Sequence, residues 1–139
     1  MRSFFLMMSV VTFISCKTTT EKGIVFPKAT KEFVWQGANI YFLLTDRFKN
    51  ADPSNDIQFN RKDDAAKLRG FNGGDFKGIT EKIKEGYFTK LGINALWITP
   101  VVEQIHAGTD EGTGKSYGYH GYWTKDWTAI DPNFGTKED

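Results

Sequence analysis

Five consecutive residues, Tyr119-His120-Gly121-Tyr122-Trp123, place flat aromatic rings beside polar hydrogen-bonding groups. A sugar ring has an apolar face that an aromatic side chain can cover, and a rim of hydroxyl groups that imidazole, indole or phenol groups can bond. The alternative is a buried aromatic cluster, since Tyr and Trp usually lie in or near the core. The residue types alone therefore favour two interpretations, sugar contact and core packing.

A second group of residues carries oxygen atoms suited to a hard cation. Its members are Asn50, Asp52, Asn55, Asp56, Gly73 and Asp75. Calcium takes six to eight oxygen ligands, and carboxylates, amides and main-chain carbonyls from two loops could supply them. The sequence therefore predicts a structural Ca²⁺ site. The alternative treats the first loop as a set of Asx turns and Asp75 as the N-cap of a helix.

The N-terminus has the pattern of an export signal. Arg2 precedes an apolar run from Phe4 to Ile14, which is too short to span a bilayer but typical of a signal-peptide core. Ser15 and Cys16 follow the run, and Cys16, the only cysteine, lies where a bacterial lipobox places the lipidated residue. We therefore expect a lipoprotein signal peptide at 1–16, a polar tether at 17–33, and a bacterial protein held on the membrane by a lipid anchor. The alternative is an ordinary signal peptide with an incidental cysteine.

The composition is that of a globular protein and argues against nucleic acid as a partner. The 139 residues are 40% hydrophobic and 25% charged, with a formal net charge of +1. Lysines and arginines are scattered among acidic residues and form no basic stripe that could follow a phosphate backbone.

The elements that must position these groups alternate between strand and helix. Residues 38–44 and 93–99 are nearly unbroken apolar runs, which predicts two parallel strands buried on both faces. Between them Ile79, Ile83, Tyr87 and Leu91 recur every four residues, which predicts one amphipathic helix, with Gly92 as its C-cap. The sequence therefore predicts an α/β fold containing a βαβ unit.

A long segment follows the second predicted strand. From Val101 to Gly135 we find no convincing helical or strand period, and Thr136 with the acidic residues after it predicts the first turn of a helix. Loops of this length in a compact domain are usually functional or disordered, and this one is too aromatic for disorder. In an α/β barrel such a loop lies at the C-terminal face, where active sites are built.

Three segments, in order, resemble the alpha-amylase family (glycoside hydrolase family 13). They are Ile40–Phe48, Gly73–Pro100, and Tyr119–Trp123 with the Asp131–Thr136 segment after it. The resemblance covers residues 34–139 and is close to the calcium-binding branch that acts on cyclodextrins and maltodextrins. It implies the N-terminal part of a (β/α)₈ TIM barrel, from the first strand to the long loop after the second. Because a complete barrel needs about 250 residues, we expect 34–139 to be an N-terminal fragment of the catalytic domain.

The resemblance also implies roles for the aromatic segment. Tyr122 would stack on the sugar at the cleavage point and His120 would bond its hydroxyls, while Trp123 would line a neighbouring subsite and Tyr119 would belong to the same substrate-binding group. Asp126 and Trp127 are expected to brace the loop. The six oxygen-bearing residues match the calcium ligands of that branch in part. A lone loop histidine, His106, is expected to be solvated.

The resemblance implies a retaining glycosidase that acts on alpha-1,4-glucans or maltodextrins. Such enzymes need two carboxylates about 5 to 5.5 Å apart, which in this family come from later strands, so the chain alone is expected to be inactive. Asp46 at the end of the first strand is expected to form a structural ion pair with Arg47 instead of acting in catalysis. Two further hypotheses are a non-catalytic surface glucan-binding lipoprotein and a small calcium-stabilised module without a sugar function.

Overall fold

The computed structural model describes residues 32–61 and 64–139. The chain divides into two units, Met1–Phe33 and Val34–Asp139. Apart from Glu32 and Phe33, the first unit lies outside the described residues, and with it the predicted signal peptide, Cys16 and most of the tether. Within the described part of the chain, no helix combines the length and apolar character that crossing a membrane requires.

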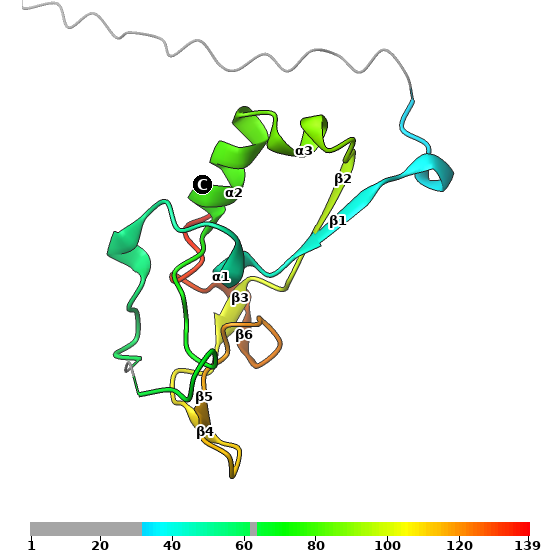
Figure 1. Ribbon diagram of the computed structural model, residues 1–139. Helices are drawn as coiled ribbons and strands as arrows, with labels where there is room; N and C mark the ends of the chain where they lie inside the picture. Colours follow the sequence, from blue (N-terminus) through cyan, green and yellow to red (C-terminus); the bar gives the residue numbers. More distant parts are fainter. Residues whose placement is uncertain (1–31, 62–63) are drawn as a thin grey trace, which may run out of the picture. The chain divides into compact units, whose positions relative to one another are not determined.

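Two parallel strands lie side by side in the second unit (Figure 1). Strand β1 (Ile40–Leu43) pairs with β2 (Ala95–Ile98), with Ile40 opposite Ala95 and Leu43 opposite Ile98. Parallel strands need a crossover connection, and helices supply it here. The predicted βαβ unit is confirmed.

The single helix predicted over Ile79 to Leu91 is two helices, so the prediction of one continuous helix is wrong. Asp75 caps helix α2 (Phe76–Lys84) by accepting a hydrogen bond from the Gly78 N–H with its side chain, and α3 (Tyr87–Lys90) follows. Gly86 separates them with a φ of +70°, a left-handed conformation that glycine adopts at low cost. Gly92 also has a positive φ, +73°, as predicted for the C-cap.

The break at Gly86 changes which residues reach the core. Leu43, Ile79 and Phe88 are buried together, with Tyr41, Phe48, Ile93 and Ile98 packed around them. The predicted stripe is therefore wrong at Ile83 and Leu91, which are about half exposed, and Phe88 takes the inward position. The short helix α1 (Thr45–Phe48) carries Phe48 from β1 into this cluster.

The helices cover one face of the β1–β2 pair and leave the other open. Ile40, Phe42 and Trp97 are 49%, 51% and 61% exposed, and the rings of Phe42 and Trp97 meet edge to face. The prediction that both faces are buried is therefore wrong for the described residues. A continuous apolar run is what a strand covered on both sides requires, so this open face still needs a cover.

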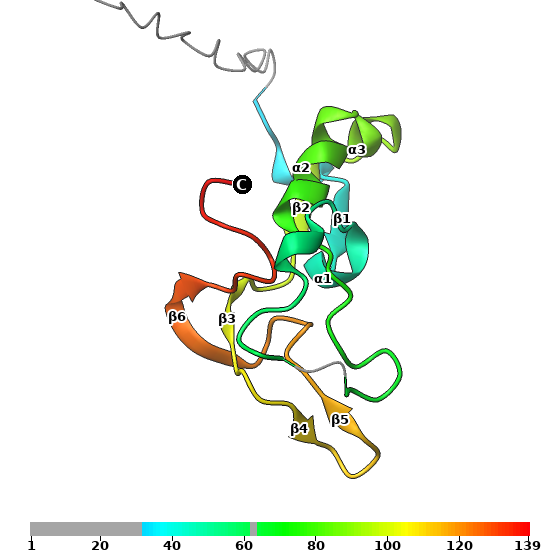
Figure 2. The same cartoon turned by 90° about the vertical axis from the view of Figure 1, so that its left-hand side faces the viewer.

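The segment after β2 contains strands that the sequence did not reveal. Strand β3 (Val102–Gln104) pairs with β6 (Thr124–Ile130) in antiparallel fashion, and β4 (Thr109–Asp110) pairs with β5 (Lys115–Ser116). Figure 2 shows β4 and β5 as a hairpin beyond the β3–β6 pair. The β3–β6 pairing has two register shifts, which break the two-residue alternation that marks a regular strand. The prediction of a structureless loop is wrong.

In the part of the unit that the structure describes, 3₁₀ turns lie at Trp35–Gly37 before β1 and at Pro53–Asn55 after α1. Thr136 to Asp139 forms no helix within the described residues, so the predicted helical turn is not present as such. Asp139 Oδ2 nevertheless accepts hydrogen bonds from the N–H and Oγ of Thr136, both at 2.8 Å, the contact by which a capping box closes the first turn of a helix.

Candidate functional site

The aromatic segment is a tight loop between β5 and β6 that lies against the end of β2. Gly121 has a φ of +86°, and a Cβ atom there would lie 2.0 Å from the carbonyl oxygen of Pro100. Its N–H donates to Gly118 O at 3.0 Å and closes a turn. Only glycine fits this close approach, so the middle residue of the motif fixes the loop to the carboxyl end of a parallel strand, the edge of the sheet where α/β sites are built.

A buried glutamine holds the other end of the loop. Gln104 is fully buried, and its Oε1 accepts a hydrogen bond from the Trp123 N–H at 2.7 Å. Its Nε2 donates to Val102 O at 2.7 Å, so both ends of the amide are satisfied. Gln104 could not be identified from the sequence, because one glutamine in a segment without visible period carries no local signal.

The structure brings the four predicted substrate-binding residues together around the imidazole of His120. Its ring centroid lies 5.2 Å from that of Tyr119 and 4.8 Å from that of Trp123, both near perpendicular. Tyr122 is nearly parallel to His120 at 5.9 Å and is 61% exposed. The loop therefore presents an open tyrosine ring with an imidazole behind it.

A main-chain hydrogen bond decides which nitrogen of His120 can carry the proton. The Tyr122 N–H donates to His120 Nδ1 at 3.0 Å, so Nδ1 acts as an acceptor. Burial lowers the pKa of His120, while the negative charge of Glu111 opposes this effect. The neutral ring with its proton on Nε2 is therefore favoured, and Nε2 can donate to a hydroxyl group.

A cavity of about 170 Å³ lies beside this loop. Its lining residues are Arg69, Glu111, Ser116, Tyr119, His120 and Trp123. Arg69 Nη1 lies 3.4 Å from Glu111 Oε2, and Ser116 Oγ donates to the same carboxylate oxygen. Charged and hydroxyl groups thus face aromatic rings, the mixture that recognises polyols. Arg69 and Glu111 stand outside any motif, so no pattern in the sequence indicated them.

Two predictions for neighbouring residues are wrong. Trp127 does not brace the loop, because it lies on β6 and is 77% exposed. Asp126 instead caps a local turn, where it accepts hydrogen bonds from the N–H and Oγ of Thr128. His106 is not simply solvated: its Nε2 lies 2.7 Å from Glu103 Oε1, and its ring stacks on Phe59 at 3.8 Å.

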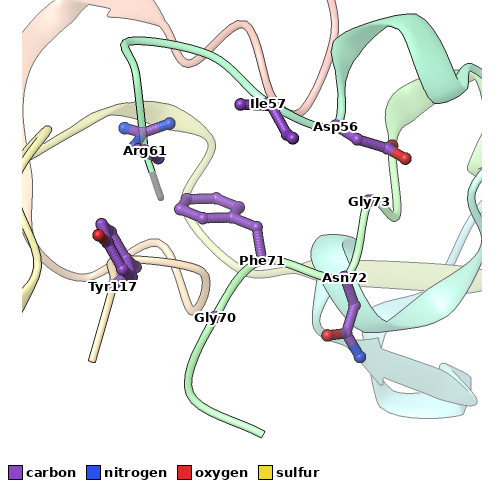
Figure 3. Close-up of a pocket in the computed structure, with 8 residues that line it drawn as sticks. All are labelled: Asp56, Ile57, Arg61, Gly70, Phe71, Asn72, Gly73 and Tyr117. Atoms are coloured by element: carbon purple, nitrogen blue, oxygen red, sulfur yellow. The ribbon is translucent and has the colours of Figure 1, made fainter. Parts of the chain in front are cut away.

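Three of the six predicted calcium ligands meet at one point. Asn50 Nδ2 donates to Asp56 Oδ1 at 2.7 Å, and a Cβ at Gly73 would lie 2.4 Å from each of these atoms. Figure 3 shows Asp56 beside Gly73, with the side chain of Asn72 pointing away. The side-chain oxygen of Asn55 is buried without a hydrogen-bond partner. A buried acceptor without a donor is the kind of group that a cation satisfies.

The remaining two predicted ligands are engaged in other contacts. Asp75 accepts from the N–H groups of Ala51, Asp52 and Gly78 at 2.9, 2.7 and 2.6 Å. Asp52 pairs with Lys77 at 2.7 Å, and Lys77 together with Ser54 lowers the pKa of Asp52 to about 2. In residues 32–61 and 64–139 no three His, Cys, Asp or Glu side chains cluster at metal-binding spacing, so a cation here would depend on amide and main-chain oxygens.

A buried polar network connects this loop to the aromatic segment. Arg61 binds both carboxylate oxygens of Asp131, at 2.8 and 2.6 Å, and donates to Gln104 O at 3.1 Å. Asn133 Nδ2 donates to the carbonyls of Asn55 and Asp56, at 2.9 and 2.7 Å. Arg61 Nε is buried without a hydrogen-bond partner among the described residues, but the other contacts of this network join the two loops directly and hold them in one arrangement.

Arg61 also lines the pocket of about 240 Å³ shown in Figure 3. Its guanidinium carbon lies 4.6 Å from the ring centroid of Phe71, a cation–π distance. The pocket adjoins Asp56 and Gly73, so the same arginine borders the candidate cation loop and supports the network beneath the aromatic segment.

Asp46 has the structural role that the sequence predicted. Its Oδ2 lies 3.1 Å from Arg47 Nε, and its carboxylate accepts from the N–H groups of Asn72 and Gly73. Burial raises the pKa of Asp46 to about 6, against the lowering effects of these donors and of Arg47. A carboxylate engaged on both oxygens orders the 72–73 turn and is not free to act on a substrate.

Comparison with known proteins relates this chain to alpha-amylases and cyclomaltodextrin glucanotransferases. The catalytic-domain family of alpha amylase matches residues 42–139. The periplasmic alpha-amylase of Escherichia coli K12 is 49% identical over 111 residues, which are 77% of this chain and 16% of that protein. The cyclomaltodextrin glucanotransferase of Klebsiella oxytoca is 40% identical over 101 residues, or 72% of this chain and 15% of that protein.

Solved structures indicate the same family relationship. The cyclomaltodextrin glucanotransferase CldA superimposes with a TM-score of 0.63 at 40% identity, over 71% of this chain and 20% of that one. The alpha-amylase of Geobacillus thermoleovorans, solved with acarbose, gives a TM-score of 0.52 at 37% identity, over 76% of this chain and 19% of that one. The 139 residues thus span about a fifth or less of the length of these relatives.

Proposed function

Because the chain belongs to the alpha-amylase family, we propose that it forms part of a glycoside hydrolase or transglycosylase that acts on alpha-1,4-glucans or maltodextrins. The names of the relatives support this substrate class: they include amylases, cyclomaltodextrin glucanotransferases and a protein solved with maltotriose. The βαβ unit would be the first part of a (β/α)₈ barrel, whose remaining elements would cover the open face of β1 and β2.

The observation that carries the proposal is the pairing of Tyr122 with His120 at the end of β2. Tyr122 offers an exposed ring face for an apolar sugar face. His120, whose Nδ1 is occupied by the Tyr122 N–H, offers an Nε2–H donor for a hydroxyl. Rings and donors at fixed spacing hold one sugar unit in one orientation, which is how binding energy is used to position a scissile bond.

We place the reacting carboxylates outside these residues. Glycoside hydrolysis needs a nucleophile and a general acid. In the described part of the chain, Glu111 borders the aromatic cavity but is bound to Arg69 and Ser116, and Asp46 is engaged with Arg47. The residues of this chain would therefore bind and orient the glucan, while carboxylates of other barrel strands, acting with retention of configuration, cleave it.

We also propose that a structural calcium ion binds at the loop of Asn50, Asn55, Asp56 and Gly73. The buried, unpartnered Asn55 oxygen and the close approach of Asp56 to Gly73 fit such an ion. When bound, the ion supplies charge that holds two loops together and takes no part in the chemistry. Asp75 and Asp52 would contribute mainly by ordering the loop, since their oxygens bind N–H and ammonium groups.

For localisation we propose export followed by lipid anchoring at Cys16. The E. coli relative is named periplasmic, which supports export. The apolar run and the single cysteine that closes it support the anchor. Cys16→Ala in the exporting host should move the protein from the membrane fraction to the soluble fraction, and unchanged fractionation would refute the anchor.

The proposed activity is tested with the complete protein and two sets of substrates. Maltoheptaose and beta-cyclodextrin should be converted to shorter or rearranged maltooligosaccharides, detected by chromatography. Cellodextrins, which have the same sugar in beta linkage, serve as the matched control and should remain intact. Binding of maltoheptaose without turnover would favour the non-catalytic glucan-binding lipoprotein. Neither binding nor turnover would contradict the proposal.

A further inference from the structure

Arg47 contacts two walls of the aromatic cavity without lining it. It lies in α1, directly after β1, and its side chain is 22% exposed. Its guanidinium carbon lies 3.9 Å from the ring centroid of Tyr119, which is a wall of the cavity. Its Nη2 donates to Leu68 O at 3.0 Å and to Gly70 O at 2.7 Å. These two carbonyls flank Arg69, which forms another wall.

The geometry of these contacts fixes the plane of the guanidinium. Nε is paired with Asp46 Oδ2 at 3.1 Å, and Nη2 holds the two carbonyls. Hydrogen bonds to a guanidinium lie in its plane, so three acceptors on two edges leave little rotational freedom. The flat face that remains rests on Tyr119. A lysine has the charge but neither the plane nor the fork of donors, so it could not make all of these contacts together.

We propose that Arg47 is a positioning residue that sets the separation of Tyr119 and Arg69, and so selects how a sugar unit sits beside His120. The inference rests on the proposed glucan-binding function of the 119–123 loop. Tyr119 meets the His120 ring edge to face at 5.2 Å, so a shift of Tyr119 changes the place of the Nε2 donor. Arg69 is itself held to Glu111 and to Gly114 O, so its approach to the cavity also follows from the backbone that Arg47 binds.

The test is Arg47→Lys in the complete protein, assayed with maltooligosaccharides. We expect KM to rise about 3- to 30-fold, the size of a desolvated cation–π contact, with kcat changed by less than about threefold. The KM of the double variant Arg47→Lys/Tyr119→Leu should not exceed the higher KM of the two single variants, because the two side chains act through one contact. Lys82→Gln is the matched control, since Lys82 lies 5.8 Å from the Tyr87 ring in the crossover helices, and its kinetics should equal those of the wild type.

Three results would overturn the inference. If Arg47→Lys has a wild-type KM and only a lower Tm, Arg47 is merely structural, and the proposed function stands. If the rise in KM in the double variant equals the product of the rises in the two single variants, Arg47 does not act through Tyr119. If Arg47→Lys does not fold, Tyr119→Leu still tests the inference. A wild-type KM in that variant would show that the position of Tyr119 does not affect glucan binding. A wild-type protein without glucan binding or turnover would instead refute the proposed function itself, and this inference with it.

Discussion

At the scale of single residues, the proposed function depends on which atoms of the 119–123 loop remain free. Nδ1 of His120 accepts a hydrogen bond from the Tyr122 N–H, and the Trp123 N–H donates to Gln104 Oε1. What remains is the open ring of Tyr122 and the Nε2–H of His120. The fold thus occupies these main-chain groups and leaves the proposed recognition groups accessible, so the proposed site would be ordered before a ligand arrives.

A pH titration tests the assigned state of His120. Because burial lowers its pKa, the folded protein binds fewer protons there than the unfolded chain. Stability from this residue should therefore be complete above about pH 6.5 and should fall as the pH drops toward the lowered pKa. NMR titration of the ring in the complete protein should give a midpoint below about 6.5, and His120→Gln should remove this part of the pH dependence of Tm. A midpoint above 6.5 would show that His120 gains stabilisation from its charge and is not the neutral donor.

The sequence predicted the aromatic residues but not their supports. Tyr119, His120, Tyr122 and Trp123 are adjacent, so their proximity is a property of the chain itself. Gln104 meets Trp123 across 19 positions, and Arg61 meets Asp131 across 70. Contacts of this kind arise from topology, and no local pattern of residue types reveals them.

At the scale of elements, the βαβ unit was predictable and the segment after it was not. Uniform apolar runs identify β1 and β2 because buried parallel strands need them. The crossover was expected as one helix, since the four-residue spacing from Ile79 to Leu91 continues across Gly86, and its left-handed φ is invisible to a periodicity count. The β3–β6 pair was missed because its two register shifts destroy the alternation.

Chelation tests the proposed calcium ion that would join the two loops at Asn50 and Gly73. If one calcium ion binds there, removal with EGTA should lower the Tm of the complete protein, because an ion that binds only the folded state stabilises it by about 2.7 kcal/mol at 100 times its Kd. Asp56→Asn should weaken this sensitivity. Asp110→Asn, on the exposed β4–β5 hairpin, is the matched control and should retain it. A Tm that is identical with and without EGTA would contradict the calcium proposal and favour the alternative that the loop is a set of Asx turns.

At the scale of the molecule, the open face of the β1–β2 pair is the main energetic problem. Ile40, Phe42 and Trp97 are each about half exposed or more, and burying one such side chain is worth about 1.5 to 3 kcal/mol. Both strands also have an unpaired edge in the described residues. The sequence predicted a cover for both faces, and residues 32–61 and 64–139 supply it for one.

We therefore expect the 139 residues, expressed alone, to fold loosely and to lack glucan hydrolysis. Thermal unfolding followed by circular dichroism should be broad, and the chain should bind a hydrophobic dye strongly. The complete protein is the control and should melt sharply. A cooperative, sharply melting monomer of the 139 residues would contradict the barrel proposal and favour the small calcium-stabilised module.

The central claim, that the 119–123 loop holds the glucan at the point of cleavage, is tested most directly by the kinetics of Tyr122→Ala in the complete protein. Trp127→Ala is the matched control, because Trp127 is also an exposed aromatic residue but lies on β6, outside the loop. A contact that strengthens in the transition state affects turnover more than binding, so kcat should fall by more than KM rises. We predict a loss of roughly 30- to 1000-fold in kcat/KM for Tyr122→Ala, about 2 to 4 kcal/mol, and wild-type kinetics for Trp127→Ala. Unchanged kinetics with a lower Tm in Tyr122→Ala would show that the ring serves packing alone and would contradict the claim.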